Sequence, residues 1–293
     1  ADIEKFTKDK ELQKEYTQRV FPELLESLRR DTTCGVFLVM ANDQPIGAPG
    51  DFTGFFLRDS DPVTKVDTNS DLLLERGDKT LARQWGITLD NSWSPAFRFQ
   101  GKGIRESDDF FYEPYTAGMA HTGVDMASLG YWSMPFILED YEMDNHKMIT
   151  YSVPLVNDGV IYGVVGTEVS VSYLCNTYFR VQDLNRQQTA GYAIAVDNGD
   201  GTYENIAGKG NLYDAVQREN GIFKLESTKH EDLFKVKDSK IGTQEIYALF
   251  SKMNLYANNV PYKNTNWVLC GFVAEDSIFS LGDKLYSDIL TTI

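Results

Sequence analysis

Apolar residues recur at every fourth position near the start of the chain. The residues that carry this spacing are Leu12, Tyr16, Val20, Leu24 and Leu28. Lys, Glu, Gln and Arg fill most of the positions between them. A period of three to four residues places side chains on one face of an α-helix. The pattern therefore predicts a long amphipathic helix over residues 1–30, which Pro22 should bend or split.

Short apolar runs bounded by turn residues follow this helix. The runs that favour strands are 35–41, 54–58, 148–156, 160–171, 192–196, 203–207, 244–250 and 267–273. Asp158-Gly159 lies between two of these runs and predicts a tight hairpin. Because short strands joined by hairpins form antiparallel sheets, the predicted fold class is α+β and not a doubly wound parallel sheet.

The order of these elements divides the chain into two mixed sheet units joined by helices. We expect a stalk helix at 1–33, a first unit at 34–174, a smaller second unit at 175–275 and a C-terminal helix at 276–293. A helix from Ser172 to about Leu184 should link the two units. Residues 86–145 show no clean period, and a segment of that length in a compact chain is usually functional.

Composition narrows the classes of partner. The chain has 28 basic and 43 acidic residues and a formal net charge of −15, which disfavours nucleic acid and anionic lipid. No apolar run reaches the roughly 18 residues of a transmembrane helix. Cys34, Cys175 and Cys270 are widely spaced among apolar residues. Buried thiols are therefore expected, and neither a disulfide framework nor a metal site is.

Motifs for catalysis or metal binding are absent from the sequence. Asp197-Asn-Gly-Asp-Gly201 resembles the start of a calcium loop, but Gly199 and Thr202 stand where such a loop needs an oxygen ligand and a glycine. A hairpin turn is expected there. The histidines are far apart, and no nucleophile elbow or phosphate-binding glycine motif occurs. We predict no catalytic residue, metal or cofactor. A secreted hydrolase-type enzyme with an acidic active site stays as the alternative, because an acid pair leaves no sequence signature.

Two aromatic clusters, at 110–115 and 132–136, lie within the segment that lacks a period. One interpretation is that these rings pin a long loop to the sheet. The other is that they wall a pocket for a small molecule, with acidic groups among them. The composition alone leaves both open.

Several stretches resemble the double Cache family of tandem PAS-like sensor domains. Met148-Ile-Thr-Tyr-Ser-Val-Pro-Leu155 and the run from Gly159 to Leu174 are similar to the closing hairpin of its membrane-distal half. The run 36–41, the stretch Gly54-Phe-Phe-Leu-Arg-Asp-Ser-Asp-Pro62, the first helix and the smaller second unit fit the same family. The resemblance spans the whole chain, and the hairpin carries most of it.

The resemblance implies a sensor without chemistry of its own. Such domains are extracytoplasmic parts of bacterial histidine kinases, chemoreceptors and cyclic-dinucleotide enzymes. It implies a membrane-distal PAS-like unit that binds a small molecule and a membrane-proximal unit that relays the signal. Flanking helices outside this chain would tether it to the membrane, so its two ends should lie at the same end of the molecule. The family also allows a homodimer through the N-terminal helix.

The resemblance also suggests site residues. Many members bind amino acids through Arg-x-Trp-Tyr, a later Tyr and an Asp in the last strand. Here Asp109 stands at the Arg position, Phe111 and Tyr112 at the Trp-Tyr position, Phe136 near the later Tyr, and Glu168 at the final Asp. Because Asp109 cannot bind a carboxylate as Arg does, ordinary amino-acid recognition is disfavoured.

The resulting hypothesis is a pocket for a cation. Its predicted aromatic walls are Tyr112, Trp132, Phe136 and Tyr151, and its polar anchors are Asp109 and Glu168. Carboxylates hold an ammonium by hydrogen bonds, and aromatic faces attract an organic cation. An amine, or an amino-acid derivative without a free carboxylate, fits this set. The alternative is that Asp109 points to solvent and a neutral ligand, or none, fills the site.

Overall fold

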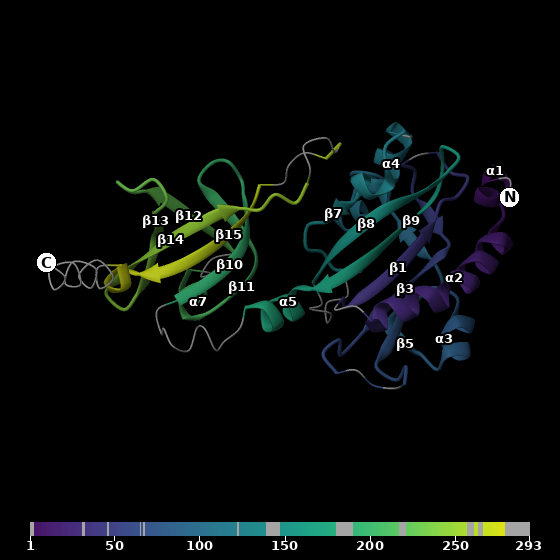
Figure 1. Ribbon diagram of the computed structural model, residues 1–293, viewed down its shortest axis with the longest axis horizontal. Coiled ribbons are helices and arrows are strands. Elements are labelled where there is room, and N and C mark those ends of the chain that lie inside the picture. The colour runs from purple at the N-terminus through teal and green to yellow at the C-terminus, as the bar shows by residue number, and fades with distance from the viewer. Residues whose placement is uncertain are drawn as a thin grey trace, which may run out of the picture. The chain divides into compact units, whose positions relative to one another are not determined.

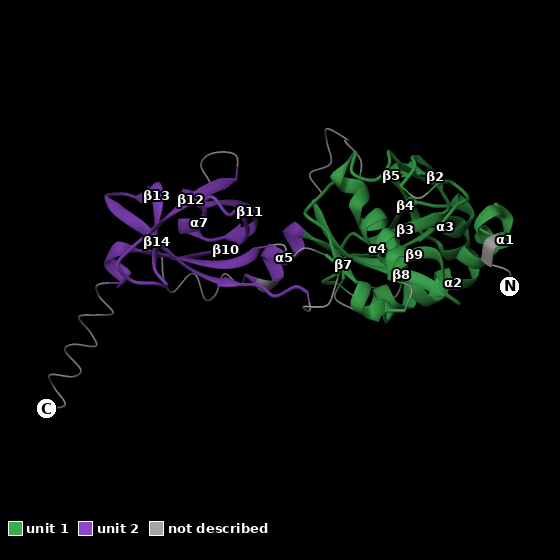
Figure 2. Ribbon diagram, turned by 90° about the horizontal axis from the view of Figure 1, so that it is seen from above, with its two compact units in different colours: residues 1–170, 257–262 green, residues 171–256, 263–293 purple. Residues whose placement is uncertain are grey.

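A computed structural model shows two compact units (Figure 2). Unit 1 consists of residues 1–170 and 257–262, and unit 2 of residues 171–256 and 263–293. The structure describes residues 3–30, 33–45, 47–64, 66, 68–121, 123–138, 147–179, 190–216, 221–256, 261–262 and 266–278. The return of 257–262 to unit 1 differs from the sequence-based division, in which these residues lie in the second unit. Tyr262 anchors the return, since its hydroxyl donates to the carbonyl oxygen of Leu129 at 2.7 Å.

Unit 1 is built on a mixed sheet with helices on both faces (Figure 1). Its elements are α1 (Ile3–Lys8), α2 (Lys10–Arg30), β1 (Gly35–Met40), β2 (Gly50–Phe52), β3 (Gly54–Asp59), β4 (Leu72–Arg76), α3 (Lys79–Trp85), β5 (Thr88–Ser94), β6 (Phe97–Phe99), η1 (Glu106–Asp108), α4 (Asp109–Ala120), η2 (Met126–Leu129), β7 (Tyr131–Trp132), β8 (Met148–Asn157) and β9 (Val160–Ser170). Among the described residues the strand order is β5-β4-β3-β1-β9-β8-β7, and β2 pairs with β6 separately. Each neighbouring pair is antiparallel except β4–β5, which is parallel. The unit is therefore α+β, as the sequence predicted.

Strand alternation divides the interior of unit 1 into two cores. Side chains of β1 at even positions pack toward α2, and those at odd positions pack toward α4. The α2-side core includes Phe21, Leu25, Leu28, Val36, Leu38, Met40, Phe55, Leu57, Leu72 and Leu74. The α4-side core includes Phe37, Val39, Phe52, Phe56, Phe97, Phe99, Phe110, Phe111, Tyr112, Phe136, Met148 and Val164. Both faces of the central strands are thus buried.

The N-terminal helix is divided at Asp9 and not at Pro22. The Asp9 carboxylate accepts hydrogen bonds from the backbone N–H groups of Glu11 and Leu12, which begins α2 there. Helix α2 then runs through Pro22 to Arg30. The expectation that Pro22 might split the helix was therefore wrong.

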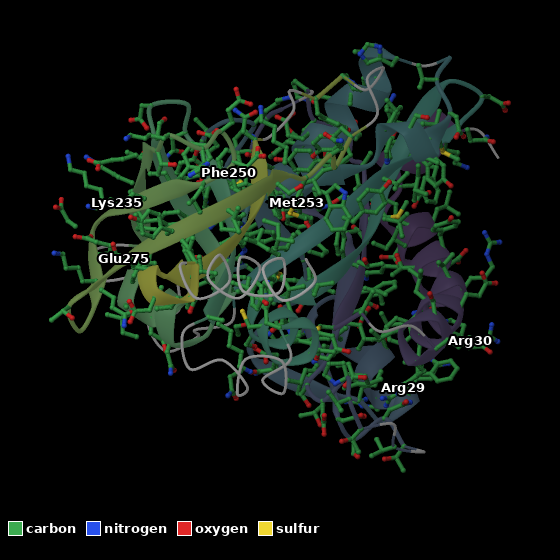
Figure 3. All side chains as sticks on the ribbon, turned by 60° about the vertical axis from the view of Figure 1, so that its left-hand side comes forward. Arg29, Arg30, Lys235, Phe250, Met253 and Glu275 are labelled. Atoms are coloured by element: carbon green, nitrogen blue, oxygen red, sulfur yellow. The ribbon has the colours of Figure 1, made fainter. Side chains whose placement is uncertain are left out.

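Arg29, labelled in Figure 3, lies at the C-terminal end of α2 and contacts two carboxylates at the ends of strands in the sheet. Its two terminal nitrogens lie 2.9 and 2.6 Å from the two carboxylate oxygens of Asp71, and Asp59 lies 3.4 Å from one of them. The hydrogen bond to Asp71 raises the pKa of Arg29. This bidentate contact holds the helix against the end of β3 and the start of β4.

The segment 86–145 is more regular than its sequence suggested. It contains β5, β6, α4 and β7, with 139–146 outside the described residues. Helix α4 has Pro114 and Gly118 inside it, and six of its residues are buried. Proline and glycine disfavour a helix in sequence-based prediction and so conceal its helical spacing. The expectation of an irregular segment was wrong here for that reason.

The predicted hairpin between β8 and β9 is confirmed. Its two central residues, Asp158 and Gly159, have φ angles of 50° and 77°. Positive values at both positions define the type I′ turn that suits the twist of paired strands.

Unit 2 is a closed antiparallel barrel with a short helix against it. Its elements are α5 (Val171–Tyr178), β10 (Ala190–Asp197), β11 (Thr202–Lys209), α7 (Asn211–Val216), β12 (Ile222–Ser227), β13 (Phe234–Ile241), β14 (Gln244–Lys252) and β15 (Trp267–Ala274). The expected turn at 197–201 joins β10 to β11, and the runs expected as strands at 244–250 and 267–273 form β14 and β15, which pair with each other. The sequence did not predict that these six strands close into a barrel. It depends on β10 pairing with β15 across some eighty residues of sequence.

Helix α7 packs on the barrel where the strands carry glycine. A Cβ atom at Gly208 would lie 2.1 Å from the Tyr213 ring, and one at Gly191 would lie 2.5 Å from the Tyr213 backbone nitrogen. These two positions therefore need glycine so that the helix can approach. The inner face of the barrel and α7 form a core separate from those of unit 1.

Three expectations concern residues outside the described part. The linking helix is described only as α5, the C-terminal helix only through residue 278, and the two chain ends not at all. The expectation that the ends lie together stays a prediction. Within the described residues, no helix is long and apolar enough to cross a membrane.

Candidate functional site

A buried row of polar side chains crosses the α4 side of the sheet in unit 1. The register pairs Arg58 on β3 with Gly35 on β1, Gly35 with Glu168 on β9, and Glu168 with Thr150 on β8. Directly paired residues of neighbouring strands point to the same face. The four positions therefore form one line across adjacent strands, close to the α4-side core.

Arg58 lies between two buried carboxylates. Its NH1 nitrogen is 2.5 Å from Oε1 of Glu75, and its Nε is 3.3 Å from Oε1 of Glu168. The three side chains are 7%, 2% and 0% exposed. Arg58 thus contacts two buried acidic side chains, and removing one partner from such a cluster typically costs about 3–5 kcal/mol.

Glu75 keeps its proton to a higher pH than an ordinary carboxylic acid. Burial, with smaller contributions from the nearby Glu168 and Asp90, raises the pKa of Glu75 to about 8 against the lowering effect of Arg58 and Arg76. Near neutral pH the Glu75 carboxyl therefore holds a proton. A second cation close to the pair would favour the loss of that proton.

Gly35 leaves the space in which Arg58 and Glu168 meet. A Cβ atom at this position would lie 2.7 Å from Oε2 of Glu168 and 3.0 Å from the carbonyl oxygen of Leu57. Such contacts are shorter than van der Waals packing allows. The ion pair across β1 therefore requires that β1 has no side chain there.

Two hydroxyl groups lie on the same face as Glu168. Thr150 and Ser152 are fully buried, and within the described residues their side-chain oxygens have no hydrogen-bond partner. The hydroxyl oxygen of Ser133, by contrast, accepts from the backbone N–H of Thr150 at 2.9 Å. Buried polar groups are normally hydrogen-bonded, so two such hydroxyls side by side indicate a place where a ligand or water completes the bonding.

Three of the predicted aromatic residues belong to the core on this face. Phe111 stacks on Phe99 with centroids 4.9 Å apart, and Phe136 stacks on Phe110 at 5.4 Å. The Tyr112 hydroxyl donates to the carbonyl oxygen of Ala48 at 2.7 Å. These rings fill the space between the sheet and α4, which agrees with the interpretation that the aromatic clusters pin the segment to the sheet.

Trp132 and Tyr151 lie on the opposite face of the sheet. Tyr151 alternates with Thr150 and Ser152 along β8 and pairs with Trp132 on β7, their rings 4.9 Å apart. Adjacent residues of a strand point to opposite faces of the sheet. The expectation that Trp132 and Tyr151 share one pocket wall with Tyr112 and Phe136 therefore does not agree with this register. The site residues suggested by the family resemblance did not take this alternation into account.

Asp109 begins α4 and is half-buried. Burial and, to a smaller extent, the neighbouring carboxylates of Glu113, Glu106 and Asp108 raise its pKa to about 6, while Lys102 lowers it. These carboxylates belong to α4 and to η1, directly before it.

Sequence reasoning missed Arg58, Glu75 and Gly35. Each of the two charged residues closes an apolar run, in Gly54-Phe-Phe-Leu-Arg58 and Leu72-Leu-Leu-Glu75. Charged residues are rarely buried without a partner, so a charge at the end of a strand that is apolar throughout was the available signal. Their meeting depends on the order of the strands, which that signal does not contain.

Metal chemistry has no visible site in the described residues, where no group of three His, Cys, Asp or Glu side chains could hold an ion. Cys34, Cys175 and Cys270 form no disulfide. Burial raises the pKa of Cys34 and of Cys270 to about 12, which keeps both thiols protonated and unreactive. Cys34 and Cys270 are buried, as expected, whereas Cys175 is only half-buried.

Comparisons with known proteins gave matches of fold only. No protein-family model matches the sequence, and no curated protein matches it. A methyl-accepting chemotaxis protein X has a TM-score of 0.46 at 12% identity, over 88% of this chain and 81% of that chain.

Two further solved structures are similar in the same range. One is the ligand-binding domain of the Pseudomonas aeruginosa PAO1 amino acid chemoreceptor PctB in complex with L-Arg, with a TM-score of 0.41 at 13% identity over 91% of this chain and 78% of that chain. The other is the sensory domain of the Campylobacter jejuni chemoreceptor Tlp3, with a TM-score of 0.39 at 13% identity over 89% of this chain and 74% of that chain.

Proposed function

We propose that this chain is an extracytoplasmic small-molecule sensor module of a bacterial transmembrane receptor, and that its ligand binds in unit 1. The sequence supports this through the hairpin that resembles the double Cache family. The fold supports it through a helix of 21 residues that leads into an α+β unit, followed by a second antiparallel unit. In this proposal unit 2 relays the signal, and the chain itself catalyses no reaction.

The ligand that the site favours is a small cation, for example a primary or quaternary amine. The observation that carries this is Arg58 between two buried acidic side chains, Glu75 and Glu168. An ammonium bound beside them would favour the loss of the proton from Glu75 and would pair with the carboxylate that results. The hydroxyls of Thr150 and Ser152 would accept hydrogen bonds from it.

The proposal changes the predicted anchors in one respect. In this proposal Glu168 keeps its role, and Glu75 takes the place of Asp109 as the second carboxylate. Arg58 contacts both side chains, so an amine would compete with the guanidinium for Glu168. We therefore expect moderate affinity and a strong dependence on Glu168.

Calorimetry with putrescine, choline and succinate tests this proposal on the parent chain and on Glu168→Gln. The variant keeps the volume of the side chain and leaves Arg58 in contact with Glu75; its thermal unfolding is measured first, because losing one partner of a buried ion pair lowers stability. We expect one of the two amines to bind the parent and Glu168→Gln to weaken it at least about tenfold, the scale of a lost charge-assisted hydrogen bond. Glu231→Gln, an exposed position in unit 2, is the matched control and should leave the affinity unchanged.

Two outcomes contradict the cation proposal. Equal amine affinity in the parent and in Glu168→Gln would show that the acidic cluster does not bind the ligand. Tight binding of succinate to the parent would show that the site prefers an anion. Neither outcome concerns the sensor role itself, which the gene context tests: membrane-spanning helices on both sides and a signalling output module after the second.

A further inference from the structure

Unit 1 contains a cavity of about 430 Å³ on the α2 side of the sheet, away from the acidic cluster. Its lining comes from α2, from the bend between β2 and β3, from the start of α3 and from the turn between β5 and β6. The lining residues are Lys10, Lys14, Thr17, Gln18, Asp51, Phe52, Thr53, Gly54, Asp78, Lys79, Leu81, Trp93, Pro95 and Ala96. A volume of this size is within the range of small-molecule sites.

Three lysines surround the cavity. Lys10 and Lys14 lie one turn apart on α2, and Lys79 is the first residue of α3. Lys14 pairs with the exposed Glu11 at 3.4 Å, which is a weak contact in water. Within the described residues no ion pair holds Lys10 or Lys79. In a chain of net charge −15, this concentration of basic groups around one hollow is unusual.

The two acidic residues of the lining are occupied elsewhere. The Asp78 carboxylate accepts a hydrogen bond from the backbone N–H of Thr80 at 2.9 Å and caps α3. That bond, with smaller contributions from Lys14 and Lys79, lowers the pKa of Asp78. Asp51 faces Arg98 at 3.7 Å on the exposed surface. The ammonium groups therefore outnumber the carboxylates that could balance them within the cavity.

Besides the polar side chains of Thr17, Gln18 and Thr53, the remaining wall is apolar. The Trp93 indole N–H donates to the carbonyl oxygen of Gly77 at 3.1 Å, so the indole offers the cavity its ring and not its donor. Phe52 and Leu81 are buried in the lining, and Pro95 and Ala96 close the turn beside them. A ligand here would meet cationic groups on the helix side and an apolar surface on the other.

From this arrangement we propose a second ligand site in unit 1, for a small organic carboxylate with an apolar body. Lysine ammonium groups bind a carboxylate as point charges, and the tryptophan face and the proline pack against the apolar part. An inorganic anion would use only the lysines and leave the apolar wall in water. The site is independent of the cation site, because the two share no residue.

Calorimetry with benzoate, benzamide and inorganic phosphate tests the site. Benzoate should bind the parent chain, and benzamide, which has the same shape without the charge, should bind at least about tenfold more weakly. The double variant Lys14→Met/Lys79→Met should lose at least about tenfold of the benzoate affinity, equivalent to about 1.4 kcal/mol. Lys224→Met, an exposed lysine of unit 2, makes the same type of charge change and should alter the affinity less than about twofold.

A variant that is expected to bind benzoate more tightly than the parent provides a second test. Asp78→Asn keeps a residue that caps helices well and removes one negative charge from the lining, so it should tighten benzoate binding. The proposal is overturned if benzoate does not bind at millimolar concentration, if benzamide binds equally well, if phosphate binds more tightly than benzoate, or if the double lysine variant binds like the parent. Since all the exchanged side chains are at the surface or rim, unfolding of the variants would not explain a loss.

Discussion

The contacts of Arg58 with Glu75 and Glu168 restrict which residues unit 1 can have around them. Burying two carboxylates with one guanidinium is unfavourable unless the geometry is close, and Gly35 provides that closeness. The same arrangement leaves Glu75 protonated near neutral pH. The acidic cluster therefore lowers the stability of unit 1 and, in our proposal, provides a binding site for a cation.

The titration of Glu75 predicts how stability depends on pH. Its pKa is 4.5 in the ordinary state and about 8 in the folded chain, so between these values the folded state holds a proton that the unfolded state has released. This contribution to stability is complete below about pH 4.5 and is lost as the pH rises to about 8, by at most about 1.4 kcal/mol per pH unit.

Urea unfolding at a series of pH values measures this effect. The free energy of unfolding of the parent should fall across the window, and Glu75→Gln, which cannot titrate, should show a flatter dependence. The exposed Glu231→Gln should behave like the parent. Parallel pH profiles for Glu75→Gln and the parent would mean that Glu75 is ionised in the folded state.

Among the elements, strand alternation decides which predicted residues can act together. Tyr151 and Thr150 are neighbours in sequence but lie on opposite faces of β8, so the aromatic and polar parts of the predicted site separate. Helix α4 covers the face that carries Glu168, and α2 covers the other. The two faces thus hold two different candidate sites, one acidic and one lined by lysines.

The approach of β1 to β3 depends on Gly54. A Cβ atom there would lie 2.0 Å from the carbonyl oxygen of Leu38, a backbone atom that cannot rotate away. We expect Gly54→Ala to lower the free energy of unfolding by about 1–3 kcal/mol or more, as overpacked cores do. Gly123→Ala, where an added Cβ meets nothing within 4 Å, is the control and should change stability by less than about 0.5 kcal/mol. Equal stability of the two variants in urea would show that β1 and β3 can separate without loss.

On the scale of the whole molecule, the two units have separate hydrophobic cores. Unit 1 buries its helices against both faces of a sheet, whereas unit 2 closes its sheet into a barrel and places α7 against it. Both candidate sites lie in unit 1. A change in the core of unit 2 should therefore affect stability without affecting ligand binding.

Leu212→Ala tests this separation. Leu212 is 0% exposed in the core of unit 2, so its truncation should cost about 2–5 kcal/mol. Calorimetric heating should show a lower melting temperature for one transition, and the amine affinity at 15 °C should stay within about twofold of the parent. A parallel loss of amine binding in the folded variant would mean that the site depends on unit 2.

The sequence by itself determined the features that arise from neighbouring residues. The apolar period of the first thirty residues specifies α2, Asp158-Gly159 specifies a type I′ hairpin, and the polar turn at 197–201 joins two strands. These follow from the sequence because a period or a turn is fixed by side chains within a few positions of each other. Glu168 entered the predicted site through the family resemblance of this hairpin, and its role in binding stays a prediction.

Only the tertiary structure decided what depends on distant segments. The meeting of Arg58, Glu75 and Glu168 requires the strand order β4-β3-β1-β9, and the closure of the barrel requires β10 to pair with β15. The lysine-lined cavity joins α2 to α3 and to the β5–β6 turn in the same manner. Such pairings are determined by the packing of whole cores. An apolar residue could pack against many other apolar residues of the sequence, and only the folded core decides which of them it contacts.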